Sequence, residues 1–534
     1  MADRTRSSGK RVSAAAAPRP ASLVLRGRVV TMAGADEIVA DGRVLVMGRR
    51  IVGVLAAADP LPNSFKSAPQ IDTGGTIFPG LIDLHNHFAY NLLTLWAPPE
   101  TYHNRSKWAR AGGYISNVSL PLRTLADYEV TSTALVRYVE AKALVGGTTT
   151  GQGIRTRVHG GSSMFQGSMR NAELPDNPDL PGAGTRVPNQ WVTPENVASF
   201  KNSLNTHAAY FYHLAEGTDV GARTTYFDLK TNGLITPSLV GIHTLGLQVA
   251  DRAEFGRRKA KAVWSPFSNL LLYGQTLALN EIDPATPLAL GSDWSPTGSK
   301  NLLHELKVAR WVADSQHFAL PDSELVASVT SRAAQILGWG SHLGQIAPHF
   351  LADLVVIAGQ TGDPFAGLVG ARERDVRLVL IDGTARYGDP DLVAALGADK
   401  SSLEKVGVDG VSAVFDFEAG GPLGGLTLES AERRLRAAMA DLPGFREQAD
   451  EQRASLQAAG VEAEPFQVEL DNEFIPDPND PDADAVLLAD WTRLAESVEL
   501  DTLAVDDAAH WARLDAQKNL PDGLVNAIKT AYGH

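Results

Sequence analysis

Four apolar runs in this chain each end in a histidine or an aspartate, and this repeated placement constrains the fold more than any other feature. The residues at the four ends are His85 with His87, His213, His243 and Asp293. Short apolar runs bounded by Gly and polar residues are typical of buried strands. In a closed barrel of such strands, catalytic groups gather at the carboxyl ends.

Helical patterns separate these runs. They cover Thr131 to Leu144, Ala250 to Lys259 and Ser323 to Leu337. This alternation predicts a parallel α/β architecture, and the length of the block favours a closed (β/α)8 TIM barrel over an open sheet. The stretch from Asn171 to Gln190 is rich in Pro, Gly, Asn and Asp, and we expect it to form a lid near the substrate, because long irregular loops are often functional.

Short β-rich runs flank the barrel block on both sides, and we expect them to pair into one small β-sandwich. Beyond about Gly388 the pattern changes to a mainly helical extension, with a helix from Leu428 to Leu442, whose role the sequence leaves open. The expected division is a disordered tail at 1–20, β-sandwich segments at 21–78 and 343–388, a metal-dependent barrel at 79–342 and the C-terminal extension at 389–534.

Composition narrows the classes of function. The 534-residue chain has a net charge of -14, which disfavours nucleic-acid binding, since contact with phosphates needs a basic surface. It contains no Cys, so His and carboxylates remain as metal ligands. No apolar run has membrane-spanning length and no secretory signal is visible, so we expect a cytoplasmic protein that acts on a small molecule.

The pair His85 and His87 ends one strand. Side chains alternate along a strand, so both imidazoles point the same way and form half of a metal site. Two alternatives remain open for the segment 213–216. His213 could be a packed core histidine, with His207 as the true ligand, and Glu216 could simply cap a following helix.

Five segments carry a family resemblance, namely 79–87, 213–216, His243, 265–270 and 291–293. Together they resemble the amidohydrolase superfamily, and in particular its cytosine, guanine and triazine deaminase branch. The resemblance covers roughly residues 21–388. It implies a hydrolase that acts on carbon-nitrogen bonds other than peptide bonds.

The resemblance also implies roles for individual residues. The implied ligands of one divalent ion, zinc or iron(II), are His85, His87, His213 and Asp293. Asp293 would also take a proton from the ion-bound water, Glu216 would carry a proton to the leaving nitrogen, and His243 would hold the hydroxide or the developing oxyanion. Some members bridge two ions with a carbamylated Lys, but the candidate strand at 148–153 has no Lys, so we predict one ion.

Two further residues are candidate substrate contacts. Gln152 ends the candidate strand, although a satisfied polar residue at a strand end explains it equally well. Trp294 follows Asp293 and could wall an aromatic-binding pocket, and core packing explains it as well.

Deamination of a nitrogen heterocycle is the leading reaction. Hydrolysis of an amide or cyclic amide would use the same ion, water and proton carrier. A rival of another class is a non-catalytic barrel that binds a ligand or protein partner, but burying His and Asp side chains without a metal is costly. Family members are often oligomers, so a homo-oligomer is compatible with the resemblance.

Overall fold

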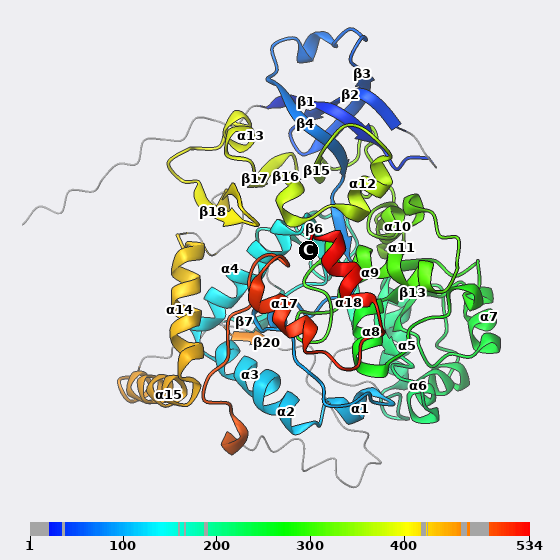
Figure 1. Ribbon diagram of the computed structural model, residues 1–534, viewed down its shortest axis with the longest axis vertical. Coiled ribbons are helices and arrows are strands. Elements are labelled where there is room, and N and C mark those ends of the chain that lie inside the picture. The colour runs from blue at the N-terminus through cyan, green and yellow to red at the C-terminus, as the bar shows by residue number, and fades with distance from the viewer. Residues whose placement is uncertain are drawn as a thin grey trace, which may run out of the picture.

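The computed structural model describes residues 21–34, 38–158, 161–164, 167–185, 191–417, 423, 425–460, 467–469 and 491–534. The tail expected at 1–20 lies outside these residues. Figure 1 shows a sheet at one end of the molecule and a barrel with its helices below it. The C-terminal helices α17 (Ala508–Asp515) and α18 (Leu524–Ala531) lie across the face of the barrel turned to the viewer.

The two flanking segments form one nine-stranded sheet with the order β18-β19-β17-β16-β15-β4-β1-β2-β3. Its strands are β1 (Ser22–Val30), β2 (Ile38–Met47), β3 (Arg50–Ala56), β4 (Gln70–Pro79), β15 (Leu354–Ala358), β16 (Val376–Ile381), β17 (Thr384–Gly388), β18 (Glu404–Val408) and β19 (Val411–Phe415). β4 joins the two halves, because it pairs parallel with β1 and antiparallel with β15. This confirms that the two β-rich blocks pair. Side chains of β1 alternate between two apolar clusters, with Leu23 and Leu25 on one face and Val24 on the other.

Eight short strands form the barrel wall in the described residues. They are β5 (Leu81–Asp83), β6 (Thr148–Gly151), β9 (Arg170–Asn171), β10 (Gly184–Thr185), β11 (Tyr210–Leu214), β12 (Leu239–His243), β13 (Lys261–Trp264) and β14 (Leu288–Leu290). All their pairings are parallel. A parallel bridge between Asn86 and Asp293 closes the ring between the last strand and the first. The expected barrel is confirmed, with two departures in the described residues. The strands β7 (Arg155–Val158) and β8 (Gly161–Met164) stand between β6 and β9 in place of a helix, and residues 172–183 join β9 to β10 without one.

Helices cover the outside of the barrel. They are α1 (Arg105–Trp108), α2 (Gly112–Tyr114), α3 (Leu120–Asp127), α4 (Glu129–Val145), α5 (Val197–Thr206), α6 (Val220–Thr231), α7 (Val249–Arg257), α8 (Pro266–Tyr273), α9 (Leu302–Ser315), α10 (Asp322–Ser328), α11 (Ser331–Leu337) and α12 (Pro364–Gly370). Helix α4 is buried along most of its length, because it lies between β6 and a helix of the extension, α14 (Leu428–Ala440). Asp219 and Asn301 cap α6 and α9 by accepting hydrogen bonds from backbone N–H groups.

Two predictions for the barrel block were wrong. The helix expected over 323–337 is divided into α10 and α11, because Thr330 leaves the helical conformation and the neighbouring Val329 carbonyl accepts a hydrogen bond from Ile82 of the barrel. The described part of the expected lid, residues 171–185, supplies β9 and β10 and buries Ala172 and Leu180, so it belongs to the wall. Residues 186–190 lie outside the described residues.

The C-terminal extension shares the core of the barrel. Its elements are α13 (Pro390–Ala395), α14, α15 (Leu442–Ala458), β20 (Gln467–Glu469), α17 and α18, together with β18 and β19, which continue the sheet past residue 388. β20 pairs with β7 (Arg155–Val158), which in turn pairs with β8 (Gly161–Met164). Leu435, Leu500 and Val505 are buried in the same apolar cluster as the barrel helices. The boundary expected at 388 therefore does not divide the core.

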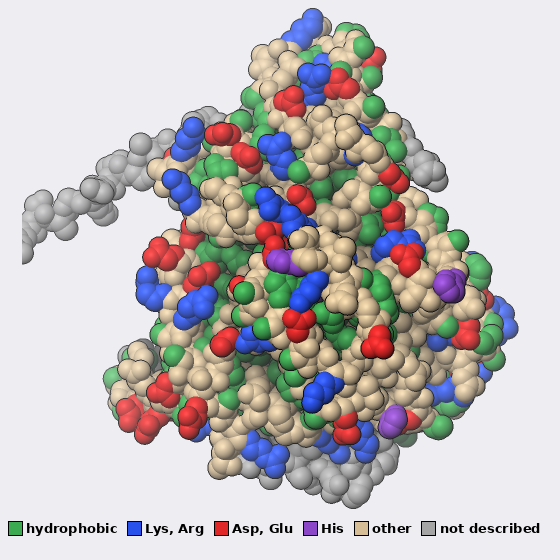
Figure 2. All heavy atoms as spheres, viewed as in Figure 1, with side chains coloured by type: hydrophobic (Ala, Val, Ile, Leu, Met, Phe, Trp, Pro, Cys, Tyr) green, Lys and Arg blue, Asp and Glu red, His purple; other side chains and the backbone are tan. Residues whose placement is uncertain are grey.

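The surface bears charges of both signs. On the face in Figure 2, Lys and Arg side chains alternate with Asp and Glu, and acidic residues gather over α15, where Glu447, Asp450 and Glu451 are exposed. Within the described part of the chain, we find no helix that combines the length and the apolar character needed to cross a lipid bilayer.

Candidate active site

The barrel brings five of the sequence-predicted residues together at the carboxyl ends of its strands. His85 and His87 follow β5, His213 lies in β11, His243 ends β12, and Asp293 follows β14. All five side chains are buried, with His85 fully so. Segments far apart in sequence thus converge on one point at the rim where barrel enzymes carry their chemistry.

His85 lies at the centre of this cluster. Its ring centroid is 4.9 Å from that of His87 and 5.0 Å from those of His213 and His243. Its Nε2 atom lies 3.2 Å from Oδ1 of Asp293, and His87 Nε2 lies 3.6 Å from the same oxygen.

The donor set fits a metal ion. Two sets of three residues each bring one potential ligand atom per residue within 4.8 Å of one another. One set is His85, His213 and His243, and the other is His85, His87 and Asp293. Nδ1 of His85 is buried without a hydrogen-bond partner among the described residues, and Nε2 has no hydrogen bond beyond its 3.2 Å approach to Oδ1 of Asp293. Buried nitrogens without a partner are costly, and a bound cation would satisfy them. The site therefore has the donors for a divalent ion.

Electrostatics keep these side chains in the forms that bind a cation. Burial by itself raises the pKa of Asp293, but the attraction of the surrounding His85, His243 and His87 holds it well below its ordinary value. Burial lowers the pKa of His213 well below its usual range, and the nearby Arg105 lowers it further. Burial also lowers the pKa of His243. A carboxylate and neutral imidazoles are the ligating forms.

The backbone is strained where it presents these groups. His243 and Asp293 have φ values of 65° and 61°, and Ala215, before Glu216, has 49°. Such left-handed conformations are unfavourable for residues with a Cβ and often occur at functional sites. Next to Asp293, a Cβ at Gly291 would lie 2.5 Å from Cβ of His85, so only glycine lets the end of β14 approach the first ligand strand.

Three polar residues fix the loops that carry His85, His87 and Asp293. Asn86 Nδ2 donates to Asp83 Oδ2 at 3.0 Å and to Ser292 Oγ at 2.9 Å, and Ser292 Oγ donates to Asp83 Oδ2 at 2.5 Å. Asn86 lies between His85 and His87, while Ser292 precedes Asp293. Polar contacts of this kind orient metal ligands and are part of a metal site.

Glu216 lies at the edge of the ligand cluster. Its Oε1 accepts a 2.7 Å hydrogen bond from the Tyr273 hydroxyl, which in turn accepts one of 2.8 Å from Trp108 Nε1. Its Oε2 is buried without a hydrogen-bond partner among the described residues and lies 3.6 Å from Nη1 of Arg105. Helix α6 is capped by Asp219, so Glu216 is not its cap.

Tyr273, Trp108 and Arg105 were not predicted from the sequence. Tyr273 ends α8, which begins at Pro266 within the recognised segment 265–270, whereas α1 belongs to the long excursion between β5 and β6. The extent of the 265–273 helix could have pointed to Tyr273. No motif marks Arg105 or Trp108.

His243 is held in one orientation by Asn269. Its Nδ1 donates a 2.9 Å hydrogen bond to Oδ1 of Asn269, from the recognised segment 265–270. In a neutral ring the other nitrogen, Nε2, is then an acceptor, and it lies 3.9 Å from Oε1 of Glu216. His243 can thus accept a proton or ligate, but it cannot donate from Nε2 unless it is protonated.

The remaining sequence candidates fall in different places. Gln152 is buried directly after β6, with its backbone N–H donating to the Asp83 carbonyl at 3.3 Å. Trp294 is buried with its ring centroid 5.1 Å from that of His87 and 4.4 Å from that of Tyr90, so it packs within an aromatic cluster beside the ligands. His207, the alternative ligand, lies after α5 and bonds the Ser203 carbonyl instead.

Several solved structures share this fold. They include an adenosine deaminase from Xanthomonas campestris with bound zinc (TM-score 0.52, covering 71% of this chain and 98% of that one), the guanine deaminase of E. coli (0.53, 68% and 99%) and a triazine hydrolase from Arthrobacter aurescens (0.53, 71% and 99%). Each is 18% identical to this chain, so the likeness concerns the fold.

Residues 201–386, which include three of the five clustered residues, match the model of the amidohydrolase family. This region of the chain is similar in sequence to the amidohydrolase family. The amidohydrolase signature thus coincides with the strands β11, β12 and β14 that carry His213, His243 and Asp293.

Two curated relatives are also similar to this chain in sequence. A 5-methylthioadenosine/S-adenosylhomocysteine deaminase from Pelotomaculum thermopropionicum is 22% identical over 416 residues, which are 68% of this chain and 92% of the relative. One of the same description from Syntrophobacter fumaroxidans is 28% identical over 167 residues, which span 29% of this chain and only 38% of that protein's length.

Proposed function

We propose that this protein is a metal-dependent hydrolase that deaminates an amino-substituted nitrogen heterocycle. The observation that supports the proposal best is the buried carboxylate of Glu216, whose Oε1 lies 3.9 Å from Nε2 of His243 in the cluster of four imidazoles and a carboxylate, and whose Oε2 has no hydrogen-bond partner among the described residues. A carboxylate oxygen in that position can carry a proton between water and a ring nitrogen. The relatives described as deaminases support the same class of reaction.

The ligands of the ion are His85, His87, His213 and Asp293 in this proposal, and the ion is zinc or iron(II). A divalent ion bound there supplies a water molecule whose pKa is lowered towards neutrality. His243 Nε2 is an acceptor and orients that water by accepting a hydrogen bond from it. Asp293, kept ionised by the surrounding imidazoles, accepts a proton from the water.

Glu216 moves the proton that the leaving group needs. The water oxygen would form a bond to the ring carbon, and the bond from that carbon to the amino nitrogen would break. Of the two protons of the water, one would pass through Glu216 to the amino group, which leaves as ammonia, and the other would pass from Asp293 to the ring nitrogen, so that both carboxylates return to their starting state. Tyr273 and Trp108 hold Oε1 in place, so Oε2 serves as the carrying atom. Gln152 contacts the heterocycle, and Trp294 forms a rigid aromatic wall for it.

The test combines elemental analysis with an ammonia-release screen over nucleobases, triazines, pterins and simple amides. We expect about one metal equivalent per chain and ammonia from a ring amine. Glu216→Gln should keep the metal and lose turnover by a factor on the order of 10²–10⁴. Glu254→Gln is the matched control, because Glu254 lies on α7 and bonds Tyr226 and Lys230 instead.

Other outcomes redirect or overturn the proposal. Metal without ammonia release, combined with hydrolysis of an amide or cyclic amide, would establish the amide hydrolase instead. Absence of any ion under metal-replete conditions would favour a non-catalytic barrel. Unchanged turnover in Glu216→Gln would remove this carboxylate from the mechanism.

A further inference from the structure

A segment of the C-terminal extension enters the interior of the barrel domain. Leu500 forms an antiparallel bridge with Leu93, and the next residue, Asp501, donates its backbone N–H to the Leu92 carbonyl at 2.8 Å. The Tyr138 hydroxyl of α4 donates to the carbonyl of Asp501. The side chain of Asp501 is buried, although the residue lies more than 300 positions after α4 in the chain.

Asp501 is the carboxylate of a buried ion cluster with two lysines. Its Oδ2 accepts a 2.5 Å hydrogen bond from Nζ of Lys142, and its Oδ1 lies 3.0 Å from Nζ of Lys300. Burial lowers the pKa of Lys142 to about 8, against the attraction of Asp501. Lys300 also donates to Thr502 Oγ1 at 2.7 Å and to the Ala504 carbonyl at 3.0 Å, so it attaches the same segment twice more.

Lys142 connects this cluster to the residues beside the metal ligands. Its Nζ donates to the Asn91 carbonyl at 2.8 Å and to Ser295 Oγ at 2.6 Å. Asn91 Oδ1 accepts from the backbone N–H of Ser295 at 2.8 Å, and Asn91 Nδ2 donates to Oδ1 of Asn86 at 2.9 Å. Asn86 separates His85 from His87, and Ser295 lies two residues after Asp293.

From this path we infer that Asp501 is a positioning residue of the active site. It orients Lys142, which holds Asn91 and Ser295, and these fix the two loops that carry His85, His87 and Asp293. The inference rests on the proposed function in one respect, since it takes these three residues to be metal ligands. It assigns the extension a role in the catalytic centre, in addition to packing.

The geometry favours positioning over simple attachment. Lys300 alone would fasten the segment, because it contacts Asp501, Thr502 and Ala504. Lys142 instead divides its three hydrogen bonds among the extension, the loop after His87 and the loop after Asp293. An ammonium group with three donors directed at three segments fixes their relative placement.

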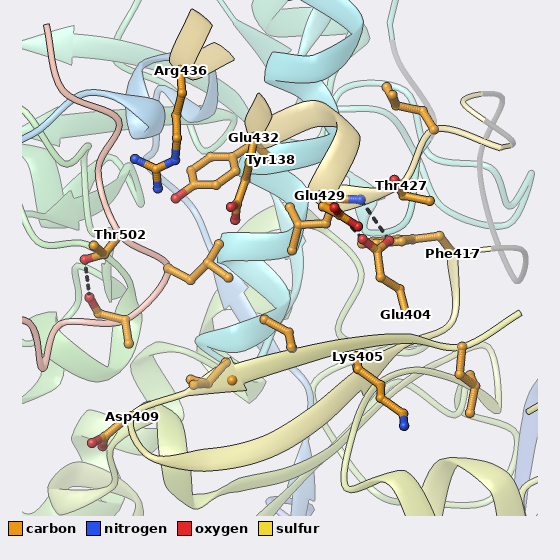
Figure 3. A pocket seen from close by; sticks show the side chains of 18 of the residues that line it. Tyr138, Glu404, Lys405, Asp409, Phe417, Thr427, Glu429, Glu432, Arg436 and Thr502 are labelled. Carbon is orange, nitrogen blue, oxygen red and sulfur yellow. Dashed lines mark hydrogen bonds between the residues drawn. The ribbon is translucent and has the colours of Figure 1, made fainter. Parts of the chain in front are cut away.

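The segment's outer side borders a groove of about 1040 Å³ between β18, α14 and residues 502–507. Figure 3 shows Tyr138 and Thr502 on one wall of this groove and Glu404, which accepts a hydrogen bond from the backbone N–H of Glu429, on another. Thr502, which directly follows Asp501, and Tyr138, which donates to the Asp501 carbonyl, thus line this groove. Displacing this segment would expose Lys142 and release the two ligand loops.

The test uses the full-length protein and Co²⁺ as a spectroscopic probe of ligand geometry. Asp501→Asn removes the charge at almost constant shape, and Ser295→Ala removes only the hydroxyl that Lys142 contacts. We expect Asp501→Asn to bind Co²⁺ about 10–100-fold more weakly, with an altered visible spectrum, and to lose kcat by a similar factor while KM stays within about twofold. Ser295→Ala should change the same quantities by a smaller factor.

Asp515→Asn is the matched control, since Asp515 lies in α17 and pairs with Lys529 at the surface. It should bind Co²⁺ with the spectrum and affinity of the wild type. If Asp501→Asn folds with wild-type affinity and spectrum and only a lower Tm, the segment merely attaches the extension and the inference is overturned. If Asp501→Asn does not fold, a wild-type spectrum in Ser295→Ala overturns it. Altered Co²⁺ binding in a protein that releases no ammonia would support the inference while refuting the proposed function.

Discussion

The Tyr273 hydroxyl donates a 2.7 Å hydrogen bond to Oε1 of Glu216, which leaves Oε2 as the carboxylate oxygen without a hydrogen-bond partner among the described residues. Trp108 donates to the same hydroxyl, so the direction in which Tyr273 donates is fixed. Burial is the main reason why the pKa of Tyr273 is raised well above its ordinary value, and the adjacent Glu216 raises it further. The hydroxyl therefore stays protonated and remains a donor.

Tyr273→Phe removes this donor and leaves the ring in place. We expect kcat to fall by about tenfold, because Glu216 loses the contact that selects its orientation, and the metal content to stay unchanged. Steady-state ammonia release and elemental analysis measure both. Tyr226→Phe is the control, as its buried ring carries a hydroxyl that bonds Glu254 on the outer side of the barrel. Equal activity in the two variants would contradict the role of Tyr273.

The double variant His85→Ala, His87→Ala should lose the bound metal. It removes two of the proposed ligands, including the imidazole at the centre of the cluster. Elemental analysis after dialysis in metal-replete buffer measures the effect. His207→Ala should keep a full equivalent, because His207 bonds Ser203 away from the site. A full equivalent in the double variant would refute the ligand assignment.

Asn269→Ala should impair turnover without unfolding the protein. The Oδ1 atom of Asn269 accepts from Nδ1 of His243 and so keeps its Nε2 free to accept. Loss of such an orienting partner typically costs about 10–100-fold in activity or metal affinity. Kinetics and a thermal melt separate the two effects, and a variant with wild-type kcat would show that Asn269 does not set the tautomer.

Glu140 predicts a pH dependence of stability. Burial raises the pKa of this carboxyl to about 7, although the nearby Arg137 and Arg386 favour its charged form. The pKa of this carboxyl in the unfolded state is near 4.5, so the folded form binds the proton more tightly than the unfolded form does. The stabilisation by the protonated group is thus complete below about pH 4.5 and lost as pH rises through about 7.

Glu140→Gln removes this dependence, because the amide cannot ionise. We expect the Tm difference between the variant and the wild type to shift in favour of the variant between pH 5 and pH 8. The corresponding change in the free energy of unfolding should be a few kcal/mol, since each pKa unit corresponds to about 1.4 kcal/mol. Calorimetry at several pH values measures it. A difference in Tm that is constant across this range would show that Glu140 does not titrate in the folded state within this window.

The barrel and the polar residues at its rim could be predicted from local patterns in the sequence. His85, His213, His243 and Asp293 each end an apolar run, and parallel strands bring such ends together whatever the intervening sequence. The same reasoning could not find Arg105, because its position depends on how the long excursion between β5 and β6 folds back over the rim. Asn104 within that excursion bridges Gly217, a contact between residues more than a hundred positions apart.

Two other features depend on tertiary context. The composition of residues 171–185 is that of a surface loop, yet Arg170 at its start is buried and pairs with Asp353 and Asp382 of the nine-stranded sheet. Nothing in the local sequence reveals those partners. Likewise Asp501 lies in an acidic, weakly patterned part of the chain, and only the lysines it meets explain its burial.

The position of Asp501 in the chain bears on the order of events during synthesis. Lys142 and Lys300 are translated with the barrel, whereas their carboxylate follows about two hundred residues after Lys300. A nascent chain that has emerged only as far as the last barrel helix must bury two ammonium groups without a counter-ion, which strongly disfavours the native arrangement. We therefore expect the barrel interior to mature only after residue 501 has left the ribosome.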